Sequence, residues 1–106
     1  MNKTLQLMGL ARRAGKLLIG HDAVMDAVKK QNVKLILLTS DASARHKREL
    51  QAAGYAGKTV SLNCDMQTAG LATGRRSCIY ALEDAGFAAA VQKTTDEEDT
   101  QHGCKI

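Results

Sequence analysis

The chain has 106 residues, of which 44% are apolar and 3% aromatic, and its net charge is +4. This length predicts one domain with one core, the apolar content excludes a disordered chain, and the scarcity of aromatic residues disfavours RNA-binding folds that stack bases on exposed rings. The longest strongly apolar run, residues 35–38, is too short to span a membrane and no signal peptide is recognisable, so we expect a cytoplasmic protein.

Positive charge is concentrated in the first half of the chain. Residues 1–58 hold 11 Lys and Arg against 4 Asp and Glu, whereas residues 59–106 hold 4 against 7. The acidic and polar composition of residues 94–106 predicts a disordered tail behind one folded domain, residues 1–93. The three cysteines are widely spaced, so we expect free thiols, no metal site and no cofactor.

The first predicted helix extends from Lys3 to Ala14, where apolar residues recur at helical spacing. Gly15 stands where a helix-terminating glycine belongs. The cations around it complement the negative end of the helix dipole; they are Arg12, Arg13 and Lys16. A short apolar edge strand is predicted at residues 17–19, and Gly20 ends it.

The second predicted helix has Asp22 as its N-cap and ends near Gln31. Its buried stripe is expected to contain Ala23, Val24, Ala27 and Val28. Residues 34–39 are continuously hydrophobic, which is typical of a central strand covered on both faces. A third helix, very basic in its first turns, follows this strand and ends at Ala53.

Strand and helix patterns keep alternating through the second half of the chain. Strands are predicted at residues 59–62 and 78–82, and helices at residues 65–72 and 86–92. The alternation predicts the α/β class and a three-layer α/β/α sandwich with about four strands.

Motifs for catalysis are weak. The sequence contains no glycine-rich dinucleotide motif and no Walker motif. Asp22 and Asp26 lie one helical turn apart and would suit a magnesium-dependent nuclease. The stronger interpretation is that Asp22 caps the helix and that Asp26 faces solvent. His21 and His46 have no partner at motif spacing, which favours polar surface residues over general bases. We therefore expect no enzyme activity.

Features for binding a phosphate backbone are stronger. A helix that begins after Gly20 presents free N–H groups and the positive end of its dipole, and Lys16, with the arginines before it, adds charge. In a sandwich with this alternation, the loop Gly74-Arg75-Arg76 and the segment Gly20-His21-Asp22 can share one edge of the sheet. The arginines would then hold phosphates, while His21 and Asp22 reach a base edge or a ribose hydroxyl. An ordinary solvated turn is the alternative for Arg75 and Arg76.

Residues 8–16, MGLARRAGK, and the following Gly20 resemble the N-terminal signature of the bacterial YlxQ proteins, a group within the ribosomal L-seven-Ae/L-thirty-e family. The likeness continues through residues 33–38 and 40–43 and ends with Gly74 and residues 84–87, so it spans nearly all of the predicted domain. The resemblance implies an α/β/α sandwich with a mixed sheet that binds kink-turn RNA.

The resemblance also implies which residues would contact RNA. In the family, the second helix opens with Gly, any residue, Asn, Glu and, three positions later, Lys. Here those positions hold Gly20, His21, Asp22, Ala23 and Asp26. Ala23 stands where the family has glutamate, and Asp26 stands where it has lysine and so carries the opposite charge. Both differences weaken a standard kink-turn contact. The family's second contact loop corresponds to Gly74, Arg75 and Arg76, where the positive charge is kept.

The sequence therefore predicts a monomeric, non-catalytic protein that binds structured RNA. Ribosomal RNA, with a kink-turn or a related internal loop, is the candidate ligand. The predicted binding residues are Arg13, Lys16, Gly20, His21, Asp22, Asp26, Gly74, Arg75 and Arg76. The alternative is a protein–protein interaction module whose basic face docks on a ribosomal or RNA-processing protein.

Overall fold

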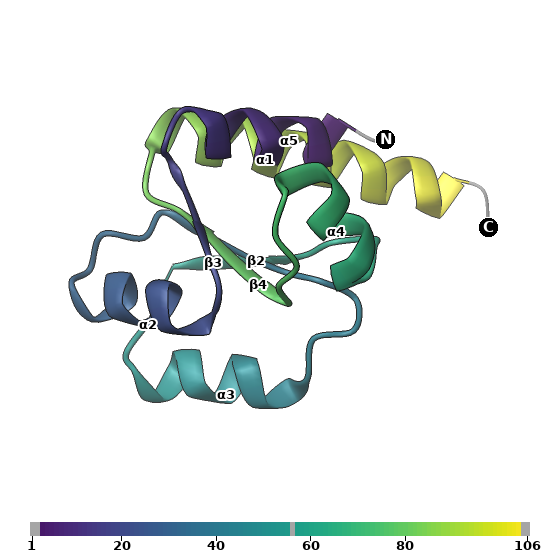
Figure 1. Cartoon of the computed structure of the whole chain (residues 1–106). Coiled ribbons are helices and arrows are strands. Elements are labelled where there is room, and N and C mark those ends of the chain that lie inside the picture. The colour runs from purple at the N-terminus through teal and green to yellow at the C-terminus, as the bar shows by residue number, and fades with distance from the viewer. Residues whose placement is uncertain (1–2, 56, 105–106) are drawn as a thin grey trace.

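The structure is a computed structural model that describes residues 3–55 and 57–104, with side chains described up to Asp96 (Figure 1). Within these residues helices and strands alternate along the chain. The elements are α1 (Lys3–Arg13), β1 (Leu17–Ile19), α2 (His21–Lys29), β2 (Leu35–Leu38), α3 (Ala44–Ala52), β3 (Lys58–Ser61), α4 (Met66–Thr73), β4 (Ile79–Leu82) and α5 (Ala85–Cys104).

The four strands form one mixed sheet in the order β1-β4-β2-β3. Strand β4 is antiparallel to both of its neighbours, and β2 is parallel to β3. Helices α1, α4 and α5 lie on one face of the sheet, and α2 and α3 lie on the other (Figure 1). The predicted fold class, a three-layer α/β/α sandwich with a mixed sheet, is confirmed.

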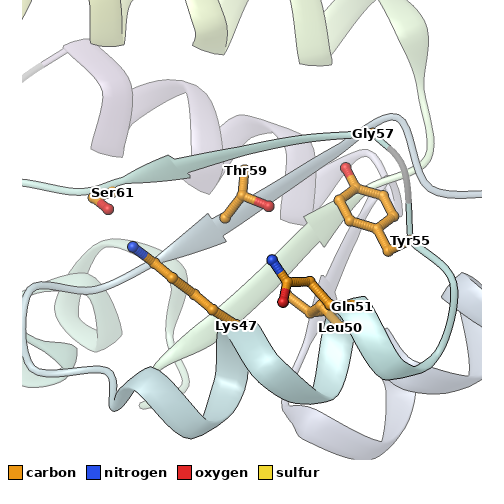
Figure 2. Close-up of a pocket in the computed structure, with 7 residues that line it drawn as sticks. All are labelled: Lys47, Leu50, Gln51, Tyr55, Gly57, Thr59 and Ser61. Atoms are coloured by element: carbon orange, nitrogen blue, oxygen red, sulfur yellow. The ribbon is translucent and has the colours of Figure 1, made fainter.

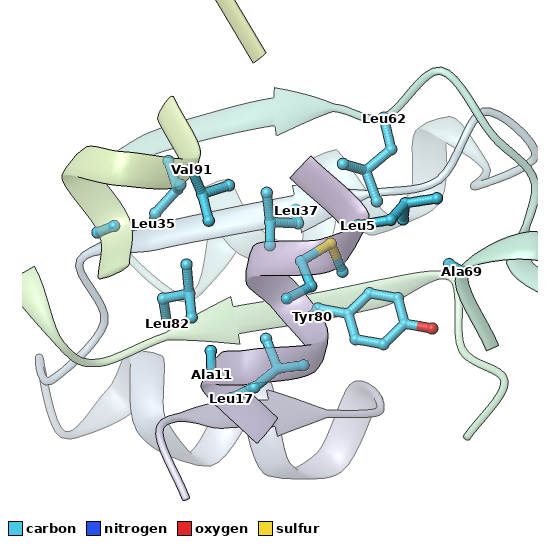
Figure 3. Close-up of a cluster of buried hydrophobic side chains, with 12 residues drawn as sticks. Leu5, Ala11, Leu17, Leu35, Leu37, Leu62, Ala69, Tyr80, Leu82 and Val91 are labelled. Carbon is cyan, nitrogen blue, oxygen red and sulfur yellow. The ribbon is translucent and has the colours of Figure 1, made fainter. Parts of the chain in front are cut away.

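Strand β2 connects two hydrophobic cores because it is covered on both faces. Leu35 and Leu37 pack under α1, α4 and α5 in the larger cluster, together with Tyr80 of β4 (Figure 3). Ile36 and Leu38 pack against α2 and α3 in the second cluster. Successive side chains of a strand point to opposite faces, so an uninterrupted apolar run is what this position requires.

Helices α1 and α4 approach each other closely at Gly9. A Cβ atom added there would lie 2.9 Å from the carbonyl oxygen of Ala72, which real Cβ contacts do not tolerate. The glycine therefore allows Met8 and Ala11, both fully buried, to reach the core from the same helix.

Two predictions about α2 are wrong. The helix begins at His21 with Gly20 as its N-cap, and no side chain caps it, so Asp22 lies in the first turn instead. Gly20 has φ 101°, a conformation that glycine adopts without strain. Ala23 is exposed because it lies about 100° around the helix from Val24, at the margin of the buried stripe, and only Val24, Ala27 and Val28 are buried.

Helix α5 also differs from its predicted end at Gln92, because it continues to Cys104. Thr95 is buried, and the hydroxyl of Thr94 lies 2.8 Å from that of Thr4 on α1, so residues just past the predicted end pack against the domain. Of the tail predicted at residues 94–106, residues 105–106 lie outside the described part.

Within the described residues, no helix has the length and apolar character that crossing a bilayer requires. In the part of the chain that the structure describes, neither Cys64 nor Cys78 forms a disulfide, and the side chain of Cys104, the third cysteine predicted to be free, lies outside that part.

Candidate nucleic-acid interface

Four loops meet at one end of the sheet. Antiparallel pairing places the start of β4 beside the end of β1, and both lie at the end of the sheet where β2 and β3 finish. Backbone hydrogen bonds join the loops: Gly20 donates to Ile79 at 3.1 Å, Thr39 donates to Cys78 at 3.0 Å, and Ser40 donates to Cys64 at 2.8 Å. The structure therefore brings Gly20 and the loop before β4 to one end of the sheet.

The loop between α4 and β4 is held in one conformation by its neighbours. Gly74 caps α4 with φ 88°, in the left-handed region that favours glycine. The carbonyl of Arg75 accepts two hydrogen bonds, from the hydroxyls of Thr73 and Tyr80, each at 3.1 Å. The backbone of this loop is fixed from inside the protein, and the side chains of Arg75 and Arg76 remain exposed.

A third arginine reaches the same loop from α1. A Cβ atom added to Gly74 would lie 3.2 Å from Nη1 of Arg12, so this guanidinium group lies against the loop. Within the described residues, Arg12, Arg75 and Arg76 form no ion pair. Among the described residues no carboxylate neutralises their charge, which is the electrostatic requirement for holding phosphates. The predicted site omitted Arg12. Its position among the cations in the last turn of the first helix is the sequence feature that could have included it.

Arg13 and Lys16 lie elsewhere. Arg13 lines a groove between α1 and α4 with Leu10 and Leu71. Lys16 precedes β1 whereas Gly20 follows it, so the strand separates the two residues. The structure thus does not gather all the predicted cations at Gly20.

His21 connects the start of α2 to α3. Its Nε2 hydrogen-bonds the carboxylate of Glu49, and its Nδ1 lies 3.4 Å from Oδ1 of Asp22. The hydrogen bond with Glu49 raises the pKa of His21, and Asp22 adds to the rise. The same bond lowers the pKa of Glu49, which also accepts from Nε of Arg45 at 2.8 Å. Sequence reasoning missed this contact because 28 residues separate His21 from Glu49.

The two aspartates of the nuclease hypothesis have other partners. Oδ2 of Asp26 lies 3.1 Å from Nζ of Lys30, one helical turn away, and both side chains are 65% exposed. Asp22 is fully exposed beside His21. In the described part of the chain, no three His, Cys, Asp or Glu side chains gather as metal ligands.

Asp41 fixes the loop between β2 and α3 to the start of α4. Its carboxylate accepts from the hydroxyl of Thr39 at 2.5 Å and from the N–H of Met66 at 3.1 Å. The hydrogen bond from Thr39, followed by that from Met66, lowers the pKa of Asp41. The ends of three helices, α2, α3 and α4, are therefore held in fixed positions around this end of the sheet.

Known proteins share both the sequence and the shape of this chain. The "RNA-binding protein YlxQ" of Enterococcus faecium is 26% identical over 88 residues, covering 81% of this chain and 84% of that protein. The protein of the same name from Bacillus subtilis (strain 168) is 47% identical over 38 residues, covering 36% of this chain and 38% of its own length. The chain is therefore similar to proteins named RNA-binding protein YlxQ over most of its length. No protein-family model matches it.

Two solved structures share the fold of this chain. A protein of unknown function from Bacillus halodurans is 32% identical, with a TM-score of 0.81 over 91% of this chain and 99% of that one. The Giardia lamblia 15.5kD RNA binding protein is 13% identical, with a TM-score of 0.67 over 88% of this chain and 84% of that one. At that identity, the second likeness shows the shared fold.

Proposed function

We propose that this protein binds structured RNA, without catalysis, through the end of the sheet where the four loops meet. The observation that carries the proposal is a group of three arginines, Arg12, Arg75 and Arg76, that have no ion-pair partner among the described residues. They lie on or against a loop whose backbone is fixed from inside, at the same end of the sheet as the start of α2. The names of the relatives support RNA as the ligand. We further propose that the protein acts in the cytoplasm on ribosomal RNA.

An internal loop related to a kink-turn is the RNA structure that we propose. The arginines hold phosphates on either side of the loop, and His21 and Asp22 face the bases. Ala23 is exposed and offers no hydrogen bond, while Asp26 is paired with Lys30 and carries the wrong charge for a phosphate. These two positions argue for a ligand that differs from a standard kink-turn.

The test measures binding of kink-turns, other internal loops and plain duplex at several salt concentrations. We expect an internal loop to bind best, with an affinity that falls as salt rises. Arg75→Gln and Arg76→Gln should each reduce the log–log salt slope by about 0.7 to 0.9 per lost phosphate contact. Lys93→Gln, the same loss of charge on an exposed residue of α5, is the matched control and should change little. A slope near zero, or no binding to any of these RNAs, contradicts the proposal.

An apolar groove favours a second function, docking of a ribosomal or RNA-processing protein. Leu10 is 51% exposed and Leu71 is 79% exposed, and both line a groove of about 460 Å³ between α1 and α4, beside Arg13. Exposed apolar side chains next to a cation suit an amphipathic acidic partner. Pull-downs with and without nuclease separate the two functions, because only a direct protein partner survives digestion of the RNA.

A further inference from the structure

A second groove, which is mainly polar, lies between α3 and the edge strand β3, at the opposite edge of the sheet from β1. It encloses about 260 Å³, less than the roughly 300 to 1,000 Å³ typical of pockets for drug-sized ligands. Most of the residues around it have polar or small side chains, and the buried Leu50 is the apolar one; the lining is Lys47, Leu50, Gln51, Tyr55, Gly57, Thr59 and Ser61 (Figure 2). We call this cavity the α3–β3 groove.

The register of β3 leaves its outer edge open. Among the described residues, strand β3 pairs with β2 alone, and the N–H of Leu62 donates inward to the carbonyl of Leu38 at 2.7 Å. Backbone groups alternate in direction along a strand, so those of Thr59 and Ser61 point away from the sheet. Their side chains lie on the α3 side of the strand (Figure 2). The groove therefore offers both hydroxyl groups and unpaired backbone groups.

The lining of the α3–β3 groove carries positive and neutral polar groups. None of its residues is acidic, and Lys47 and Gln51 extend from α3 toward β3 (Figure 2). Among the described residues, neither side chain has a hydrogen-bond or ion-pair partner. An ammonium group suits a phosphate, and an amide suits the donor and acceptor edge of a base.

Tyr55 forms a rigid wall at one end of the groove. Its hydroxyl donates to the carbonyl of Lys58 at 2.5 Å, and its ring lies so close to Gly57 that an added Cβ would be 2.6 Å from the hydroxyl oxygen. Burial raises the pKa of Tyr55, so the phenol stays neutral at physiological pH. The wall therefore does not repel a phosphate group.

The α3–β3 groove begins at the interface already described. Ser61 ends β3 at the same end of the sheet as Gly20, whereas Gly57 precedes β3 at the opposite end. A strand of RNA that leaves the four loops can thus follow β3 from Ser61 to Tyr55.

We propose that the α3–β3 groove binds a nucleotide of a single-stranded RNA segment that adjoins the structured element. Lys47 holds a phosphate, and the amide of Gln51 and the hydroxyl of Thr59 read the edge of the base. This inference rests on the proposed function and extends its ligand. An acidic peptide added to the β3 edge fits less well, because an added strand needs side-chain pockets at alternate positions, and the groove is one polar cavity.

The experiment compares one internal-loop hairpin with the same hairpin carrying six unpaired nucleotides at its 5′ or its 3′ end. We expect one of the two extensions to raise affinity at least about fivefold, as a bound base typically does. Lys47→Gln and Gln51→Ala should abolish that gain and leave the affinity for the plain hairpin unchanged. Lys93→Gln, which removes the same charge from an exposed site on α5, should keep the gain.

The other possible outcomes show whether the groove, the proposed function or both are contradicted. If the plain hairpin binds and neither extension raises its affinity, the groove does not take RNA although the proposed function holds. If Lys93→Gln removes the gain as fully as Lys47→Gln, the effect is general charge and the groove is not a site. If an acidic peptide binds instead and protects the amides of Thr59 and Ser61 from hydrogen exchange, a peptide is the ligand. If the plain hairpin does not bind, the proposed function fails, and the two fall together.

Discussion

The hydroxyl of Tyr80 provides a direct test of how the arginine loop is held. The ring is fully buried in β4, and its hydroxyl donates to the carbonyl of Arg75. Thr73 also donates to this carbonyl, but its single proton is shared with the carbonyl of Ala69, which lies 2.9 Å away. Tyr80 is therefore the main donor. Tyr80→Phe should lower the free energy of unfolding by about 1 kcal/mol, the net worth of one hydrogen bond.

Urea denaturation measures this loss, which corresponds to roughly 0.5 M in the midpoint at a slope of about 2 kcal/mol/M. Adding Thr73→Val to Tyr80→Phe leaves the Arg75 carbonyl with neither donor. The double variant should thus lose about 1 kcal/mol more than the sum of the single variants. Additive losses would refute the view that both hydroxyls hold one carbonyl.

The same change should weaken RNA binding, because a loop that is no longer fixed loses conformational entropy when it binds. Tyr55→Phe is the matched control, since it removes an equivalent hydroxyl-to-carbonyl bond at the far end of the groove. It should cost less stability than Tyr80→Phe, because water can replace its exposed hydrogen bond, and it should leave the affinity for a plain hairpin unchanged. Equal losses of affinity in both variants would show that stability alone, and not the loop, governs binding.

Three further changes test the core, the glycine cap and the histidine. Leu37→Ala, at a fully buried position, should cost about 2 to 5 kcal/mol of unfolding free energy in urea, while Leu71→Ala should cost under about 0.5 kcal/mol. Gly74→Ala should cost about 1 to 3 kcal/mol in the same assay, because alanine is strained at φ 88°. The stability from the His21–Glu49 pair should be full between the lowered pKa of Glu49 and the usual pKa of histidine, where both groups are charged. Both this stability and RNA affinity should fall as pH rises through the raised pKa of His21, because only the protonated ring carries charge. His21→Gln should flatten this pH dependence, and an unchanged profile would rule His21 out.

The order of the elements follows directly from sequence pattern. The run Leu35–Leu38 is apolar at every position, and the structure places it between two cores, because only a strand covered on both faces accepts such a run. The short apolar segment at residues 17–19 and the glycines around it likewise predicted the edge strand β1. Local periodicity is enough for these features, since each depends on neighbours within a few residues.

Features that depend on distant residues were not predictable in the same way. The contact of His21 with Glu49 arises from the packing of α2 beside α3, and no local pattern encodes it. The α3–β3 groove depends on which strand lies at the sheet edge, which the alternation of elements does not specify. Even a local feature, the N-cap of α2, was misassigned, because the carboxylate of Asp22 suits a cap by chemistry while Gly20 takes the position by conformation.

Three of the hydrogen bonds that join the four loops use backbone atoms alone, in addition to the bond that the Asp41 carboxylate accepts from Met66. Gly20, Thr39 and Ser40 donate through their main-chain N–H groups to main-chain carbonyls, so these bonds do not depend on the identity of most side chains. Mutations at exposed positions such as Ala23 can therefore accumulate while the architecture persists. Residues that face the ligand can therefore change one at a time during evolution, and ligand preference can change without loss of the folded structure.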